Sequence, residues 1–195
     1  MKRLLTVLFF VTSLSNAIAQ QNDSLLLGVK NYVEMKGNIK LLKDKDKEKG
    51  VLDSALVSIL NEKKELVTTF YSNRKGKVDF KLPLQRKFSI EISKKGCVSK
   101  IIEINTKMPQ NKVKNYEFSF DIGIFEEVKG LNVSVLKKPI AKINYNTFMS
   151  VFDYDYNYTG KINMEIEKMY RDYYDLQQSM SEEEEYKKKV KKKRN

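Results

Sequence analysis

Apolar and polar residues alternate along much of the chain between Tyr32 and Tyr145, and this alternation limits the folds open to it. In the segment VDFKL, the apolar residues Val78, Phe80 and Leu82 fall on one face and the charged residues on the other. The segments ALVSI, FSIEIS and YEFSFDIGI repeat the pattern. Successive side chains of a β-strand point to opposite faces, so each segment is expected to form a strand with one buried face.

Short polar segments with turn-forming residues separate the predicted strands. They are DKDKEKG from Asp44, NEKK from Asn61, NRKG from Asn73, PLQR from Pro83 and KKG from Lys94. Turns at this spacing predict about seven strands in a small antiparallel β-sandwich of the immunoglobulin type. The charged segment DKDKEKG leaves two interpretations open, a solvated hairpin tip and a recognition loop.

Part of this region carries motifs of a known domain family. They are the Ala-x-Val-x-Ile strand at Ala55, the Ser-Asn-x-x-Gly turn at Ser72, and the Lys-Gly step at Lys95 after an Ile-Glu-Ile strand. Over residues 32–106 the chain resembles the carboxypeptidase regulatory-like domain, a transthyretin-like β-sandwich common in exported proteins of Gram-negative bacteria. The resemblance implies a non-catalytic accessory or binding role, because the family has no catalytic residues to carry over. Cys97 stands where the family usually has an aromatic residue.

The N-terminus predicts a secretory signal that is cleaved after residue 19. Two cations precede an apolar run from Leu4 to Leu14, and small residues end at Ala19, which is the pattern that signal peptidase requires. The run is shorter than the roughly 20 residues that cross a bilayer, and no later apolar stretch reaches that length. We therefore expect an exported protein, periplasmic or associated with the outer membrane, without a transmembrane segment once the signal is removed.

The residue types that are missing exclude several chemistries. The chain has no histidine and one cysteine, Cys97. The lack of histidine removes Ser-His-Asp and Cys-His catalysis and most catalytic zinc sites. A pair of glycosidase carboxylates needs no histidine, but no pair stands out. We expect neither enzymatic activity nor a cofactor. For Cys97, a buried apolar role and a reactive thiol both remain open.

The formal net charge of +12 is mainly a property of the C-terminal tail. The signal and the tail KKKVKKKR, residues 187–194, hold nine of these charges, which leaves +3 for the rest. An exported protein is not expected to meet nucleic acid. The tail therefore predicts attraction to an envelope protein or to an anionic envelope surface, weakened by salt. A solvated tail that only keeps the protein soluble is the alternative.

A helix with one apolar face is expected over residues 161–195. Apolar residues recur three or four positions apart from Ile162 to Met180, as in an amphipathic helix. This face either packs on the sandwich or on a second copy of the chain, or it binds a partner, with the tail steering the encounter. The candidate partner-binding residues are the apolar Ile166, Met169, Tyr173, Leu176 and Met180, and the basic Lys187, Lys188, Lys189, Lys191, Lys192, Lys193 and Arg194.

The stretch DYDYNYTGKINMEIE, which begins at Asp153, matches a calcium loop only in part. Asp153, Asp155 and Asn157 fit ligand positions 1, 3 and 5 of an EF-hand, but Tyr158 stands where glycine is needed. We therefore expect no metal site. The pattern instead predicts an aromatic strap that docks the start of the helix onto the sandwich. Its rings are Phe152, Tyr154, Tyr156 and Tyr158.

These predictions define the expected organisation of the chain. It consists of a signal (1–19), a linker (20–31), a β-sandwich (32–146), an aromatic and acidic connector (147–160) and a helix with a basic tail (161–195). The expected function is an accessory or adaptor module of the cell envelope that binds its partner through the helix and tail. A module that binds a carbohydrate or peptide through sandwich loops is the second hypothesis, which the tyrosines favour and the lack of tryptophan disfavours. A hydrolase is the third, and the lack of histidine argues against it.

Overall fold

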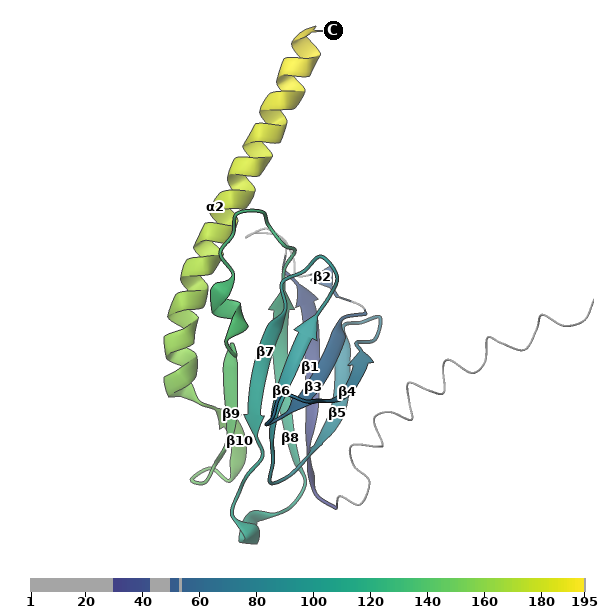
Figure 1. Ribbon diagram of the computed structural model, residues 1–195, viewed down its shortest axis with the longest axis vertical. Coiled ribbons are helices and arrows are strands. Elements are labelled where there is room, and N and C mark those ends of the chain that lie inside the picture. The colour runs from purple at the N-terminus through teal and green to yellow at the C-terminus, as the bar shows by residue number, and fades with distance from the viewer. Residues whose placement is uncertain (1–29, 43–49, 53, 195) are drawn as a thin grey trace, which may run out of the picture.

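The alternating segments form the strands of a β-sandwich in the computed structural model, which describes residues 30–42, 50–52 and 54–194 (Figure 1). The predicted signal and most of the DKDKEKG segment lie outside these residues. The strands are β1 (Tyr32–Leu41), β2 (Gly50–Val51), β3 (Leu56–Asn61), β4 (Leu66–Tyr71), β5 (Lys77–Pro83), β6 (Lys87–Ser93), β7 (Lys100–Asn105), β8 (Tyr116–Ile124), β9 (Ala141–Asn146) and β10 (Val151–Tyr154). Two short 3-10 helices, η1 (Gln110–Lys112) and η2 (Ser134–Lys137), and one long helix, α2 (Tyr156–Arg194), complete the described elements.

The strands form two packed sheets. In the first sheet, β8 pairs with one edge of β1, while β5 and the short β2 pair with the opposite edge. The second sheet has the order β10-β9-β7-β6-β3-β4. The fold class expected from the sequence, a mainly β sandwich followed by a long helix, is confirmed. The expectation of purely antiparallel pairing is wrong for β1 with β8 and for β7 with β9, which are parallel. Between β7 and β9 the chain crosses to the other sheet and back, so β9 starts from the same end as β7.

The inward faces of the two sheets meet in an apolar core. On β6, Ile90 lies between Ile59 and Ile102 of the neighbouring strands, and all three are buried. From the two sheets, the rings of Phe70 and Phe80 meet with centroids 5.2 Å apart. These contacts confirm the faces that the alternation predicts.

Cys97 is part of this core rather than of an exposed site. Its side chain is buried, and it forms no disulfide. Burial raises the pKa of its thiol, with a smaller contribution from Glu126. Since the thiolate is the nucleophile, a raised pKa and burial both favour the role of a small apolar side chain.

Helix α2 begins at Tyr156, five residues before the expected boundary at residue 161. Asp155 caps it, because its Oδ1 accepts a hydrogen bond from the backbone N–H of Tyr158 at 3.0 Å. The expected connector, residues 147–160, therefore consists of the turn between β9 and β10, strand β10 and the first turn of the helix. Asp155, one of the acidic residues that alternate with the rings of the aromatic strap, is therefore the N-cap residue of the helix.

Two glycines in turns provide a matched test of the backbone. Gly76 has φ +68°, and an added Cβ would overlap the carbonyl oxygen of Ile39. Gly96 has φ +79° with nothing near an added Cβ. We expect Gly96→Ala to cost about 1 to 2 kcal/mol for the left-handed backbone alone. Gly76→Ala should cost roughly 1 to 3 kcal/mol more because backbone atoms must also move. Urea unfolding of both variants measures the difference, and equal losses would contradict the close approach of the turn to β1.

Candidate functional site

The first half of helix α2 packs on the sandwich. Ile162, Met169 and Tyr173 point into a second apolar cluster and are 3%, 4% and 1% exposed. The ring of Tyr173 lies 4.7 Å from that of Phe125, centroid to centroid, and Phe125 is itself fully buried. Residues of η2 line the other side of the cluster. For this half of the helix, the structure therefore answers the question left open by the sequence: the apolar face covers the chain's own sandwich.

The candidate partner-binding residues fall into three groups along α2. Met169 and Tyr173 are buried inside the molecule and cannot be partner contacts here, which corrects the prediction for these two. Ile166 is half-buried and packs against the edge of the cluster, and Leu176 is half-buried further along the helix. Met180 is 51% exposed, beyond the end of the sandwich. The spacing of the apolar residues predicts the buried face of α2, but it does not identify the surface that covers this face.

The basic residues of the candidate surface lie on the part of α2 that extends away from the sandwich (Figure 1). The side chains of Lys187, Lys188, Lys189 and Lys191 are exposed, whereas those of Lys192, Lys193 and Arg194 lie outside the described part. Lys187 pairs with Glu183 at 2.6 Å, and Lys189 pairs with Glu185 at 2.7 Å. The hydrogen bond to Lys187 lowers the pKa of Glu183 and raises that of Lys187. Such pairs support a helix locally, but contribute little when exposed.

Lys100 fastens the docked half of the helix to both sheets. It is only 5% exposed, and its Nζ donates hydrogen bonds to the hydroxyl of Tyr170 at 2.6 Å and to the carbonyl oxygen of Gly123. Burial lowers the pKa of Lys100 to about 8 and raises the pKa of the Tyr170 hydroxyl. The sequence contained a signal for this residue, because the alternation of KIIEIN places Lys100 on the inward face with Ile102 and Ile104.

Three of the four rings in the predicted aromatic strap contact the body of the protein. Phe152 is buried, Tyr154 stacks edge-on against Phe118 at 5.2 Å, and the Tyr158 hydroxyl donates to the carbonyl oxygen of Pro139. Tyr156 is 69% exposed, and its hydroxyl donates to Asp153. Among the described residues, no three His, Cys, Asp or Glu side chains are grouped to hold a metal ion.

A polar groove lies on the outer face of the six-stranded sheet. It has a volume of about 390 Å³ and is lined by residues from β6, β7 and β9 and from the turns beside them. Lys64 donates to Ser89 at 2.6 Å and to Glu103 at 3.2 Å, and Glu103 also lies 3.7 Å from Lys142. Lys64, Glu103 and Lys142 thus interact with one another within the groove.

Comparisons with known proteins assign neither a family nor a function. No protein-family model and no curated protein matches the chain. Similar solved structures include the Bacillus anthracis TIE protein, with TM-score 0.38 and 19% identity over 49% of this chain and 18% of that one. A double mutant of the shaft pilin SpaA from Lactobacillus rhamnosus GG gives 0.37 and 14% over 51% and 47%, and S.CueP gives 0.35 and 12% over 51% and 65%. The chain spans less than two thirds of each of these proteins, and the regulatory-like family stays a prediction.

None of the helices in the described segments combines the length and apolar character needed to cross a bilayer.

Two methionines of α2 test the docking of the helix. Met169 is buried against the sandwich, whereas Met164 is 73% exposed on the same helix. We expect Met169→Ala to lower the free energy of unfolding by about 2 to 5 kcal/mol, because it leaves a cavity in the second cluster. Met164→Ala should change it by less than about 0.5 kcal/mol. Urea unfolding compares the two variants, and an equally small effect at both sites would mean that the helix is not docked.

Lys100 predicts an unusual pH dependence of stability. Its pKa is about 8 in the folded protein and near 10.5 when unfolded, so the unfolded chain binds more protons between these values. The free energy of unfolding should therefore rise by about 2 kcal/mol from about pH 7 to about pH 9.5. Above about pH 10 the free energy of unfolding should fall. Burial raises the pKa of Tyr170 in the folded protein, so the folded state binds more protons there than the unfolded chain. Denaturant titrations at several pH values test this, and Lys100→Met should remove the rise.

Proposed function

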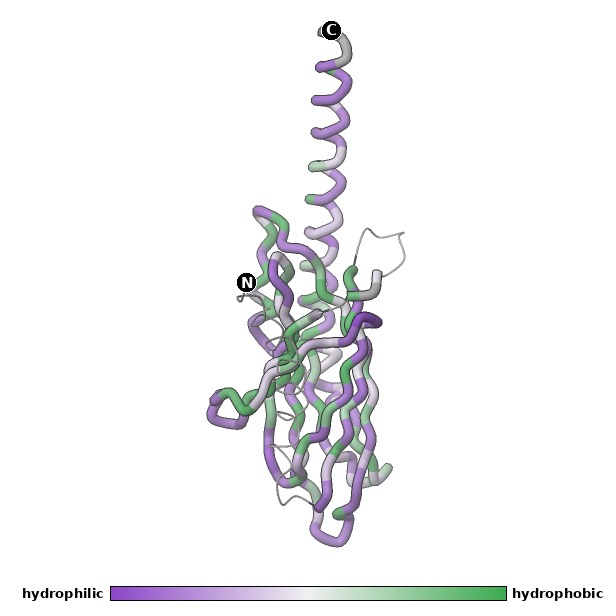
Figure 2. The backbone as a smooth tube through the Cα atoms, turned by 90° about the vertical axis from the view of Figure 1, so that its right-hand side faces the viewer, coloured by the Kyte–Doolittle hydropathy of each residue, from purple (hydrophilic) through white to green (hydrophobic). Residues whose placement is uncertain are grey.

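We propose that this chain is an exported, non-enzymatic accessory module of the cell envelope, in which the sandwich is a platform and the outer part of α2 binds a partner. The observation that supports the proposal is the division of α2. Its first half is docked through Met169 and Tyr173, while the rest, residues 178–194, extends from the sandwich (Figures 1 and 2). We name residues 178–194 the projecting segment.

The projecting segment has the properties of a surface made for contact. From Gln178 to Lys191 every described side chain is exposed except that of Val190, which is half-buried. The segment is about 25 Å long. Tyr186 is 69% exposed, and with Met180 it provides apolar contact area among the charges. A helix without tertiary contacts is stabilised only by weak local pairs, so a partner that covers it would add most of its stability.

The charges of the projecting segment indicate the chemistry of its partner. Glu182–Glu185 form an acidic block, and the basic block KKKVKKKR follows at the end of the helix. The basic block places positive charge at the point farthest from the sandwich, where it meets a partner first. An acidic envelope protein or an anionic envelope surface fits this arrangement, and electrostatic attraction would act mainly on the rate of association.

The groove on the six-stranded sheet supports a second candidate function, binding of a carbohydrate or peptide. Its lysines, carboxylates and asparagines offer both donors and acceptors. This function would not depend on α2 beyond the docked half. Removal of the projecting segment therefore separates the two candidates.

Site-specific photocrosslinking in the cell tests the proposed function. A photoreactive residue replaces Met180 in the projecting segment or, as the matched control, Met164 on the docked half. Both side chains are exposed, at 51% and 73%. We expect one envelope component to be crosslinked from position 180 and not from position 164, and Lys187→Gln, Lys188→Gln and Lys189→Gln together to reduce its yield at physiological salt. Equal crosslinks from both positions, or none, would contradict the proposal.

A truncation gives the complementary measurement. The chain must end after Gln177, because ending it at Gly160 would also remove Met169 and Tyr173 and expose Phe125. The shortened protein should keep its unfolding midpoint to within a few degrees and lose the partner. A shortened protein that still captures the same component would direct attention to the groove.

A further inference from the structure

The turn between β9 and β10 presents large apolar side chains to solvent. Phe148 is 97% exposed and Met149 is 61% exposed, and we name residues 147–150 the hairpin tip. Val151, the first residue of β10, is 41% exposed and continues the apolar surface. Phe148 is the most exposed large apolar side chain among the described residues. Single exposed apolar residues are common, but an aromatic ring this exposed at the point of a turn has no role in the core.

The hairpin tip is held in place by the side chain of Asn146. The side-chain Oδ1 of Asn146 accepts hydrogen bonds from the N–H groups of Phe148 and Met149, at 3.0 and 3.1 Å. Below the tip, Tyr145 and Phe152 face each other across the two strands with ring centroids 5.6 Å apart. Phe152 is buried in the main core. The structure therefore presents the exposed pair of residues on an anchored support.

A basic connection lies beside the hairpin tip. The neighbouring connection between β7 and β8, residues 106–115, contains three lysines and no carboxylate. Lys114 lies 5.3 Å from the ring centroid of Tyr116, whose ring lies 5.7 Å from that of Tyr145 at the base of the tip. The pKa of the Tyr145 hydroxyl is lowered, first by its hydrogen bond to Tyr116 and further by Lys112 and Lys114, so both lysines act on this site.

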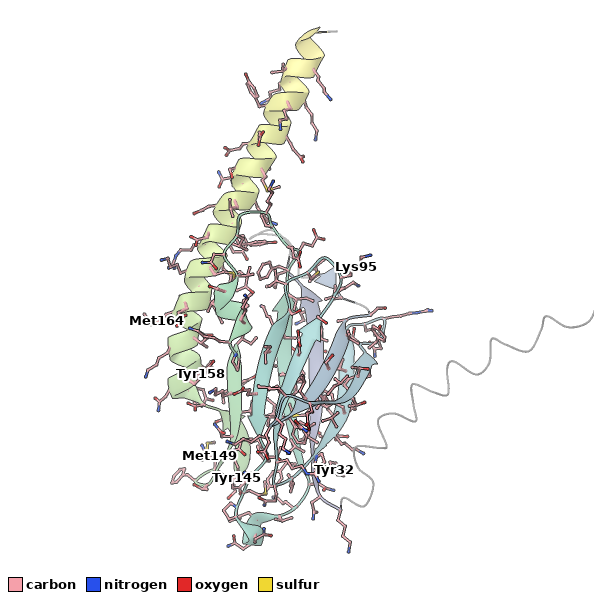
Figure 3. All side chains as sticks on the ribbon, viewed as in Figure 1. Tyr32, Lys95, Tyr145, Met149, Tyr158 and Met164 are labelled. Carbon is pink, nitrogen blue, oxygen red and sulfur yellow. The ribbon has the colours of Figure 1, made fainter. Side chains whose placement is uncertain are left out.

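The same sign of charge prevails over the whole end of the sandwich. The strand directions bring five connections together there, and they contain seven cations and two carboxylates. These connections are residues 30–31, 62–65, 84–86, 106–115 and 147–150. Figure 3 shows Met149, Tyr145 and Tyr32 at this end, opposite the end from which α2 extends.

We propose that this end of the sandwich docks on an anionic phospholipid bilayer, with Phe148 and Met149 entering the interface and the lysines of residues 106–115 contacting head groups. Aromatic side chains favour the boundary between head groups and acyl chains. Each lysine near an anionic surface strengthens binding by about fivefold, so a small apolar anchor combined with several cations gives reversible attachment.

The observations favour a bilayer over a protein pocket. A stable protein interface buries about 800 Å² on each partner, and two side chains on a convex turn offer much less. The core of a protein interface is also depleted of charge, whereas the hairpin tip stands among cations. The site is separate from the projecting segment, so the inference does not depend on the function proposed above.

A single tryptophan tests the docking directly, because the chain has none of its own. Phe148→Trp introduces the probe in the full-length protein, and Tyr71→Trp on β4 is the control, since Tyr71 is 59% exposed away from the hairpin tip. With vesicles of phosphatidylglycerol and phosphatidylcholine, we expect the emission of Phe148→Trp to shift to shorter wavelength and to be quenched by brominated lipid. The emission of the control should stay unchanged.

Two charge variants separate the hairpin tip from the basic tail as the source of vesicle binding. Lys112→Gln with Lys114→Gln should weaken the emission shift, with binding falling about fivefold for each lysine removed. Lys187→Gln with Lys188→Gln should leave the shift of Phe148→Trp in place. The proposal is overturned if vesicles leave the Phe148→Trp emission unchanged, or if binding depends on the tail lysines and not on those of residues 106–115. In the first case the hairpin tip would be assigned to a protein pocket instead.

Discussion

The contact between Phe125 and Tyr173 decides the direction in which helix α2 leaves the sandwich. Phe125 follows directly after β8 and is fully buried, so the helix can cover it only by laying one face along the sandwich. Met169, one turn earlier, and Lys100, bonded to Tyr170, hold that face in register. Because the docked half is fixed, the rest of the helix is presented in a defined direction rather than as a loose tail.

Much of the architecture could be predicted because it depends on patterns within short segments of the sequence. The alternation of VDFKL and FSIEIS identifies the inward residues of β5 and β6, and the spacing from Ile162 to Met180 identifies the apolar face of α2. The same rule even places Lys100 inward, although a buried lysine that pairs with no carboxylate of the described residues goes against residue preference. What local patterns cannot give is the identity of the surface on the other side of each apolar face.

Each difference from the sequence-based expectations arises from that limit. Tyr173 has the spacing of a partner contact, and only the three-dimensional fold shows that Phe125 is its partner. The parallel pairing of β1 with β8 joins segments about 80 residues apart, which no short window of sequence contains. Asp155 resembles the other acidic residues of its stretch, and it acts as a cap only because the next residues form a helix. The exposure of Phe148 follows from its place at a turn, which the sequence pattern does not predict.

The position of β1 has a consequence for how the chain acquires its fold. β1 is the central strand of its sheet, with β5 on one side and β8 on the other. A chain that enters a compartment N-terminus first delivers β1 and β5 early, but β8 ends only at Ile124. Until then one edge of β1 offers unpaired backbone groups and one wall of the core is missing. The early chain therefore presents an unpaired edge of β1 that β8 covers in the finished protein.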